Sequence, residues 1–166
     1  MGGRAAPDGP EDGVILRLVH PGSAPKGPLE EAARDYRQRL ERTFRVEETW
    51  VRAAKGEDRT TALADEAERI LAHVRDRDRL VALDRTGRAL SSEALAERLA
   101  AWMQARHTAV VFALGSASGL GDAVVAKAHE RWSFGPLTLP HDLARVVLWE
   151  QLYRAHTILS GVPYHK

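Results

Sequence analysis

An uninterrupted apolar run at residues 109–114, AVVFAL, is the feature that most constrains how this 166-residue chain can fold. A strand that is apolar on both faces must be covered on both, which is typical of the middle of a parallel sheet. Parallel neighbours need long crossover connections, usually helices, and strand-like and helix-like segments alternate along the whole sequence. The chain therefore predicts an α/β fold with a mostly parallel sheet and helices on both faces.

Hydrophobic spacing predicts the individual elements. Strands are expected at 14–19, 44–51, 79–84 and 109–115, and helices at 29–44, 61–74, 91–106 and 122–131. Residues 132–141, WSFGPLTLPH, predict an extended segment that a Gly-Pro loop interrupts. A long last helix is expected from His141 or Asp142, with Gly161 just past its end and Pro163 beyond.

That last helix is apolar on so many sides that one core-facing stripe cannot hold all of its apolar residues. They are Leu143, Val146, Val147, Leu148, Trp149, Leu152, Tyr153, Ile158 and Leu159. Burial on more than one side follows, and we favour a second subunit as the extra partner. The alternative is a helix that is sunk in the core of its own chain.

Composition narrows the class of protein. The chain has no cysteine, which excludes disulfides, thiolate nucleophiles and Cys-ligated metals, and favours a cytoplasmic location. No stretch reaches the roughly 18 apolar residues of a membrane span. Residues 1–12 predict a flexible extension before a single domain at 13–166. A net charge of +1 gives no basic footprint, so contact with nucleic acid needs a local patch or a surface built from more than one chain.

The glycine-rich stretch at residues 115–121, GSASGLG, follows the central strand, where ligands bind in open parallel sheets. Its glycines allow close approach of the backbone to a ligand. It is neither a Walker A loop nor the Gly-x-Gly-x-x-Gly dinucleotide fingerprint. The residues alone leave two interpretations open, a ligand-binding loop or a tight turn between strand and helix.

The segments FALGSASGL and WSFGPLTLPHDLARVVLWEQLYRAHTILSGVPYHK resemble the RlmH-type large-subunit rRNA pseudouridine N3-methyltransferases of the SPOUT superfamily. The resemblance covers the carboxyl-terminal third and is most specific at LTLPH and the terminal YHK. It implies a homodimer that uses S-adenosyl-L-methionine (AdoMet), carries a deep C-terminal trefoil knot at about 109–166, and methylates N3 of a pseudouridine in the large-subunit rRNA of assembled ribosomes. Apart from the resemblance, His20, His73, His107 and His129 show no metal-ligand spacing, so no metal is expected, and no membrane contact is expected either.

Cofactor residues are carried over by the same resemblance. They are Leu83, Gly115, Phe134, Gly135, Pro136, Leu137, Thr138 and Leu139. An adenosine needs an apolar slot with backbone donors and acceptors at its edge, which such a loop provides.

Removal of the N3 proton favours a general base or a group that stabilises the anion. His165 is the first choice, because a tail can close over the substrate, with Tyr164 and His141 as further candidates. Arg145 and Arg154 are candidates for gripping phosphate or the nucleobase anion. The alternatives are that His165 only orders the tail, that His141 only caps its helix, and that the arginines are ion-paired.

One position departs from the family pattern, since Ser116 stands where a second glycine is usual. Either the loop tolerates this side chain or cofactor affinity is lowered. Two rival functions therefore stay open: a SPOUT enzyme with another RNA target, and a non-catalytic ribosome-binding protein that keeps the fold. A generic nucleotide-binding module is a third.

Overall fold

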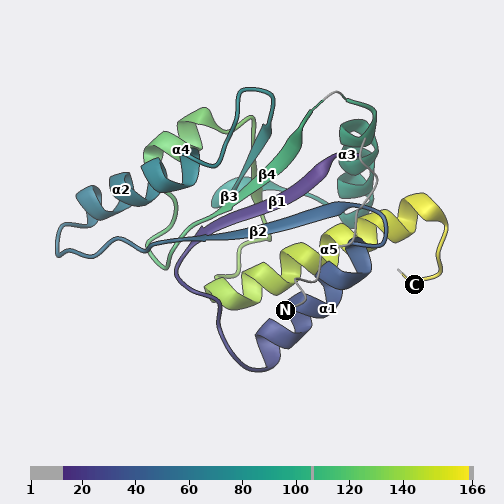
Figure 1. Ribbon diagram of the computed structural model, residues 1–166, viewed down its shortest axis with the longest axis horizontal. Coiled ribbons are helices and arrows are strands. Elements are labelled where there is room, and N and C mark those ends of the chain that lie inside the picture. Colours follow the sequence, from purple (N-terminus) through teal and green to yellow (C-terminus); the bar gives the residue numbers. More distant parts are fainter. Residues whose placement is uncertain (1–12, 106, 165–166) are drawn as a thin grey trace, which may run out of the picture.

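The computed structural model describes residues 13–105 and 107–164 (Figure 1). The extension expected at 1–12 and the candidate base His165 lie outside these residues. Within them, five strands form one sheet in the order β2-β1-β4-β3-β5, and every neighbouring pair is parallel. The strands are β1 (Ile15–Pro21), β2 (Arg45–Val51), β3 (Arg79–Ala89), β4 (Ala109–Leu114) and β5 (Glu130–Ser133). The predicted parallel α/β fold is confirmed.

Helices cover both faces of this sheet (Figure 1). One face carries α1 (Pro28–Leu40), α3 (Ser92–Gln104) and α5 (His141–Ser160), and the other carries α2 (Arg59–Leu71) and α4 (Asp122–Lys127). Side chains at the helix starts explain two of these boundaries. Ser91 accepts a hydrogen bond from the backbone N–H of Ala94 at the start of α3, and Asp58 accepts from two such groups at the start of α2.

Strand β4 lies in the middle of the sheet and is buried along its whole length, as its apolar run predicts. The larger part of the core lies between the sheet and the α1, α3 and α5 layer. There Trp102 stacks on Trp132 with ring centroids 5.5 Å apart, and Phe112 packs against both rings. These contacts attach the edge strand β5 to the core, so the loop that follows β5 starts from a fixed point.

Strand β3 has an irregularity that affects the path of β5. Leu83 and Arg88 both pair with Trp132, because β3 bulges out between them. A Cβ atom placed on Gly87 would lie 2.7 Å from backbone atoms of Arg131 and Trp132. Only glycine fits there, since β5 runs against the bulged turn at backbone contact distance.

The carboxyl-terminal third departs from the expected boundaries in two places. Helix α4 ends at Lys127 rather than 131, because the chain must begin β5 at Glu130. Strand β5 ends at Ser133, two residues before Gly135, which adopts φ 109° and turns the chain away from the sheet. The end of α5 is as predicted, with Gly161 in the left-handed conformation at φ 68°.

Helix α5 lies between α1 and α3 and against the sheet (Figure 1). Leu148, Trp149 and Leu152 are fully buried within the single chain. The core of its own chain therefore accounts for part of the wide apolar surface of α5, but Leu159 is 42% exposed, so the expected contact with a second subunit stays a prediction. No helix among the described residues is long and apolar enough to cross a membrane.

Candidate active site

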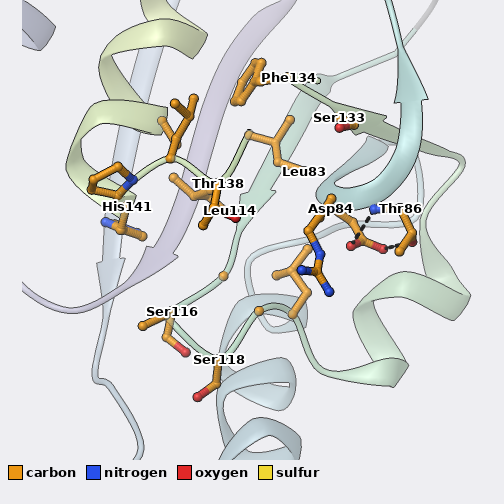
Figure 2. A pocket seen from close by; sticks show the side chains of 18 of the residues that line it. Leu83, Asp84, Thr86, Leu114, Ser116, Ser118, Ser133, Phe134, Thr138 and His141 are labelled. Atoms are coloured by element: carbon orange, nitrogen blue, oxygen red, sulfur yellow. Dashed lines mark hydrogen bonds between the residues drawn. The ribbon is translucent and has the colours of Figure 1, made fainter. Parts of the chain in front are cut away.

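A pocket of about 690 Å³ opens at the carboxyl ends of β3 and β4 (Figure 2). Its walls come from four stretches of chain and one separate side chain: residues 83–86, where the regular pairing of β3 ends, residues 114–120 at and after the end of β4, residues 132–135 with 137–140, the first turn of α5, and Arg59 at the start of α2. The volume is within the range of small-molecule sites. The pocket lies where ligands bind in open parallel sheets, as the sequence predicts for the glycine loop.

The glycine loop is a tight reversal of the chain. The backbone N–H of Gly119 donates to the carbonyl of Ser116 at 2.9 Å, and Gly119 adopts φ 90°. A Cβ atom on Gly115 would lie 2.2 Å from the Gly119 carbonyl oxygen, so a side chain at 115 is excluded. Ser116 has no such restriction, because every positive φ in the described part of the chain belongs to a glycine. The backbone of the loop therefore tolerates Ser116, whose side chain lies at the pocket (Figure 2).

The wall formed by residues 133–139 is held by local hydrogen bonds and is apolar on its inner side. The Ser133 hydroxyl donates to the Gly135 carbonyl at 2.9 Å and accepts from the Gly135 N–H at 3.1 Å. Phe134 and Leu139 line the pocket, and so does Leu137, although 78% of Leu137 is exposed. An open apolar side chain of this kind is suited to contact with a ligand or a second chain.

Polar groups of the pocket also come from the bulged part of β3 and from the start of α2. Asp84 accepts hydrogen bonds from the N–H and the hydroxyl of Thr86, at 3.2 and 2.8 Å, which fixes the turn at the pocket (Figure 2). Arg59 donates to the carbonyl of Ser118 at 3.0 Å and so connects α2 to the glycine loop. These parts of the pocket therefore present backbone and hydroxyl groups as well as the guanidinium of Arg59.

Among the candidates for the general base that the structure describes, His141, at the start of α5, lines the pocket and Tyr164 does not. Nε2 of His141 lies 3.2 Å from Nδ1 of His20, the penultimate residue of β1, and Nδ1 of His141 lies 3.4 Å from an oxygen of Asp142. His20 is fully buried, and its ring packs against Trp50 at an interplanar angle of 36°, with ring centroids 3.7 Å apart. The second nitrogen of His20 lies 3.0 Å from Oε1 of Glu48 on β2. A row of side chains therefore leads from the pocket into the core.

Glu48 is the centre of a buried charge cluster. Arg145 donates to both of its oxygens, Arg37 donates to Oε2, and Arg145 also contacts Glu30 at 2.6 Å. Burial on its own raises the pKa of Glu48, but the hydrogen bonds from Arg145, the close contact with His20 and the charge of Arg37 lower it from 4.5 to about 2. Glu48 is therefore an anion, and Arg145, which is 1% exposed, is one of its counterions and not free to grip a substrate.

The tail and Arg154 form a second cluster at the other end of α5. The Tyr164 hydroxyl donates to Glu150 at 3.1 Å, and the Tyr36 hydroxyl lies within hydrogen-bond distance of it at 3.3 Å. Burial and these two contacts raise the pKa of Tyr164. Arg154 donates to the same Glu150 carboxylate and lies over the Tyr164 ring, 4.9 Å from its centroid. Neither Tyr164 nor Arg154 lines the pocket of its own chain.

The structure thus sorts the predicted site residues into two groups. His141 and all the carried-over cofactor residues except Pro136 line one pocket. The cofactor residues that line it are Leu83, Gly115, Phe134, Gly135, Leu137, Thr138 and Leu139. Tyr164, Arg154 and Arg145 lie elsewhere. Sequence reasoning missed His20 and Glu48. His20 directly follows the predicted strand 14–19, and that position at the carboxyl end of a strand was a usable signal.

Comparisons with known proteins agree with this geometry. Residues 14–165 match the family described as "Predicted SPOUT methyltransferase". The chain is 40% identical over 154 residues to the ribosomal RNA large subunit methyltransferase H of Pseudomonas fluorescens, covering 91% of this chain and 99% of that protein. It is 38% identical over 157 residues to the protein of that name from Rhodopseudomonas palustris, covering 91% and 98%.

A more distant relative of the same name, from Caldicellulosiruptor saccharolyticus, is 35% identical over 155 residues. The match covers 92% of this chain and 100% of that protein. A solved structure of a probable methylase family protein from Haemophilus influenzae Rd KW20 has a TM-score of 0.54 at 16% identity and covers 92% of this chain and 70% of its own. At that identity it supports the fold alone. The resemblance first noted in the carboxyl-terminal third extends over nearly the whole chain, and the chain belongs to the SPOUT methyltransferase family.

Proposed function

We propose that this protein is an AdoMet-dependent methyltransferase of large-subunit rRNA, and that it modifies N3 of a pseudouridine on assembled ribosomes as a homodimer. One observation carries the proposal. Residues that the family motif assigns to the cofactor come from three separate segments, at Leu83, at Gly115 and along 134–139, and they line a single pocket. The curated relatives that are 35–40% identical are named as large-subunit rRNA methyltransferases.

The pocket suits AdoMet in shape and chemistry. Leucines and Phe134 give it an apolar lining for an adenine ring. Backbone groups of the glycine loop approach the space without obstruction, because Gly115 has no side chain to fill it. AdoMet supplies an electrophilic methyl group when it is bound, so the protein has to align the acceptor nitrogen, exclude water and take up a proton.

His141 is the described residue best placed to take up that proton. Its imidazole lies at the pocket, and histidine is the side chain that most often transfers protons in general acid–base catalysis. His165 remains a further candidate, and it lies outside the described residues.

In a homodimer, Tyr164 and Arg154 of one subunit can contact the pocket of the other subunit. Arg154 is 13 residues beyond His141 on α5, which places the two about 20 Å apart along the helix axis. A catalytic role for the tail therefore requires that it act on the pocket of a second copy. Exposed apolar side chains near the pocket, Leu137 above all, offer surface for such a contact.

Titration calorimetry with AdoMet, ATP and NAD separates this function from a generic nucleotide site. We expect micromolar binding of AdoMet alone, with the protein at the mass of a dimer. Gly115→Ala is the matched control, because the added methyl collides with the Gly119 carbonyl and should weaken AdoMet binding at least tenfold, by roughly 1.4 kcal/mol. Preferred binding of ATP or NAD would contradict the proposal.

Transfer of a labelled methyl group identifies the substrate. Ribosomes, free large subunits and tRNA from a strain lacking the corresponding gene are the acceptors, and mass spectrometry of the RNA fragments locates the product. We expect label at N3 of one pseudouridine in assembled ribosomes. Label in tRNA would favour a different RNA target, and AdoMet binding without transfer to any of them would favour a non-catalytic ribosome-binding protein.

A further inference from the structure

We propose that His20 is a positioning residue: together with Glu48 it fixes the tautomer of His141, so that Nδ1 of His141 is the nitrogen that accepts the substrate proton. This inference deepens the proposed function and rests on it for the reaction, but the tautomer itself is a property of the free protein. The three side chains come from β1, β2 and α5, which meet beside the pocket.

The assignment starts from Glu48, whose carboxylate is ionised and can only accept hydrogen bonds. Nε2 of His20 lies 3.0 Å from this carboxylate, and two lone pairs facing each other at that distance would repel. Nε2 of His20 therefore carries a hydrogen. Although the contact is not aligned as a good hydrogen bond, the negative charge stabilises the N–H at this nitrogen rather than at Nδ1.

Burial is the larger influence on His20 and lowers its pKa, more than contact with Glu48 raises it. A neutral ring with its hydrogen on Nε2 has an acceptor at Nδ1. His141 Nε2 lies 3.2 Å from that acceptor, so it must be the donor. The remaining nitrogen of neutral His141, Nδ1, then has a free lone pair.

The charges around this row agree with the assignment. His20 faces Glu48 from β2 and both His141 and Arg145 from α5, while Trp50 covers its ring. Behind Glu48, α1 contributes Arg37 and Glu30. A cation on His20 would face Arg145 and an adjacent histidine without water, so a neutral His20 is the stable state. Asp142 is an opposing charge, because at 3.4 Å from Nδ1 of His141 it favours a hydrogen on that nitrogen. Its side chain is 42% exposed and solvated, whereas that of Glu48 is 2% exposed, so the buried contact is the stronger one, and Asp142 stabilises Nδ1 after it has accepted the substrate proton.

The reaction step balances without another reagent. The ring nitrogen of the substrate nucleobase forms a bond to the methyl carbon of AdoMet, while the carbon–sulfur bond breaks and its electrons remain on sulfur. The proton of the N–H group passes to Nδ1 of His141 and from there to water. His20 and Glu48 change no bond, since they hold the imidazole in the tautomer that can accept.

Two-bond ¹H–¹⁵N correlation spectra of the uniformly labelled dimer test the tautomer directly, at a pH where His141 is neutral. We expect the wild-type protein to have the Nε2–H form of His141. His20→Leu, which fills the space without an acceptor, should give a mixture of tautomers, and His20→Asn, whose side-chain oxygen can accept near the former Nδ1, should restore the Nε2–H form. A wild-type Nδ1–H form, or an unchanged tautomer in His20→Leu, would overturn the proposal.

Kinetics of the same variants report on the reaction. We expect His20→Leu to lower kcat on the order of tenfold and to shift the pH profile, with KM for AdoMet unchanged and partial recovery in His20→Asn. His156→Leu is the matched control and should keep the wild-type rate. His156 is a half-buried histidine near the carboxyl-terminal end of α5, and it is hydrogen-bonded to Thr43. Unchanged kcat and pH profile in a folded His20→Leu protein would refute the positioning role. If no protein transfers methyl groups but the tautomers are as expected, the proposed function fails and the His20 assignment is supported.

Discussion

Each end of α5 carries an arginine that is ion-paired with a glutamate, but the two pairs differ in burial and in what surrounds them. At the amino-terminal end, Arg145 and Glu48 are 1% and 2% exposed and are packed next to the pocket. At the carboxyl-terminal end, Arg154 and Glu150 are 27% and 18% exposed and hold the tail through Tyr164. The first pair is part of a finished core, whereas the second is a surface cluster that can exchange partners at little cost.

This difference assigns the two ends different tasks. The amino-terminal end fixes the geometry of the pocket within one chain, because a buried charge cannot move without losing its counterion. The carboxyl-terminal end presents a tyrosine and an arginine at the surface, about 20 Å further along the helix from the pocket. Variants at the two ends should therefore separate stability from turnover.

Arg145→Met gives the largest expected effect. It leaves the Glu48 carboxylate buried with fewer donors, which should lower the free energy of unfolding by about 3–5 kcal/mol in urea denaturation. Arg154→Met is the matched variant at the other end and should lower it by less than about 1 kcal/mol. Equal losses in the two variants would remove the contrast between the ends.

Acid should weaken the amino-terminal end through Glu48. Its pKa in the folded state, about 2, lies below the ordinary 4.5, so its stabilising contribution is complete above about pH 5 and is lost as the pH falls toward 2. Integrated over that range the loss is about 3 kcal/mol. The difference in unfolding free energy between the wild type and Glu48→Gln should therefore shrink as the pH falls. A difference that stays constant with pH contradicts the shifted pKa.

Deletion of residues 164–166 should affect turnover far more than folding. The tail contributes half-buried contacts worth about 1 kcal/mol, but we expect methyl transfer to fall on the order of a hundredfold. Mixing the truncated chain, whose pocket is intact, with Gly115→Ala, whose tail is intact, should restore part of the activity if the tail serves the partner's pocket. Wild-type rates in the truncated protein would show that the tail has no catalytic part.

Ser116→Gly gives the smallest expected effect. The backbone at 116 needs no left-handed conformation, so removal of the side chain relieves no strain, and AdoMet affinity should change less than about threefold in calorimetry. A tenfold or larger gain in AdoMet affinity would instead mean that the Ser116 side chain occupies space that the cofactor needs.

Local patterns predicted the parallel sheet and most helix boundaries, because residues such as the buried run 109–114 and the capping Ser91 act through neighbours close in sequence. The His20–Glu48–Arg145 cluster depends on β1, β2 and α5 coming together, which no spacing in the sequence records. For the same reason the sequence did not show how much of α5 its own chain covers: α1, α3 and the sheet all pack on it, whereas Leu159 stays 42% exposed.

The packing of the last helix against the first has a consequence for biosynthesis. Residues of α1 such as Ala33 and Leu40 are shielded in part by α5, which is translated more than 100 residues later. Until then the nascent chain exposes an apolar face, and a sheet built from long-range parallel pairs closes slowly. We therefore expect the unfinished chain to depend on the shelter of the ribosome or a chaperone, and to become soluble and competent for its cofactor only when its final segment has been released.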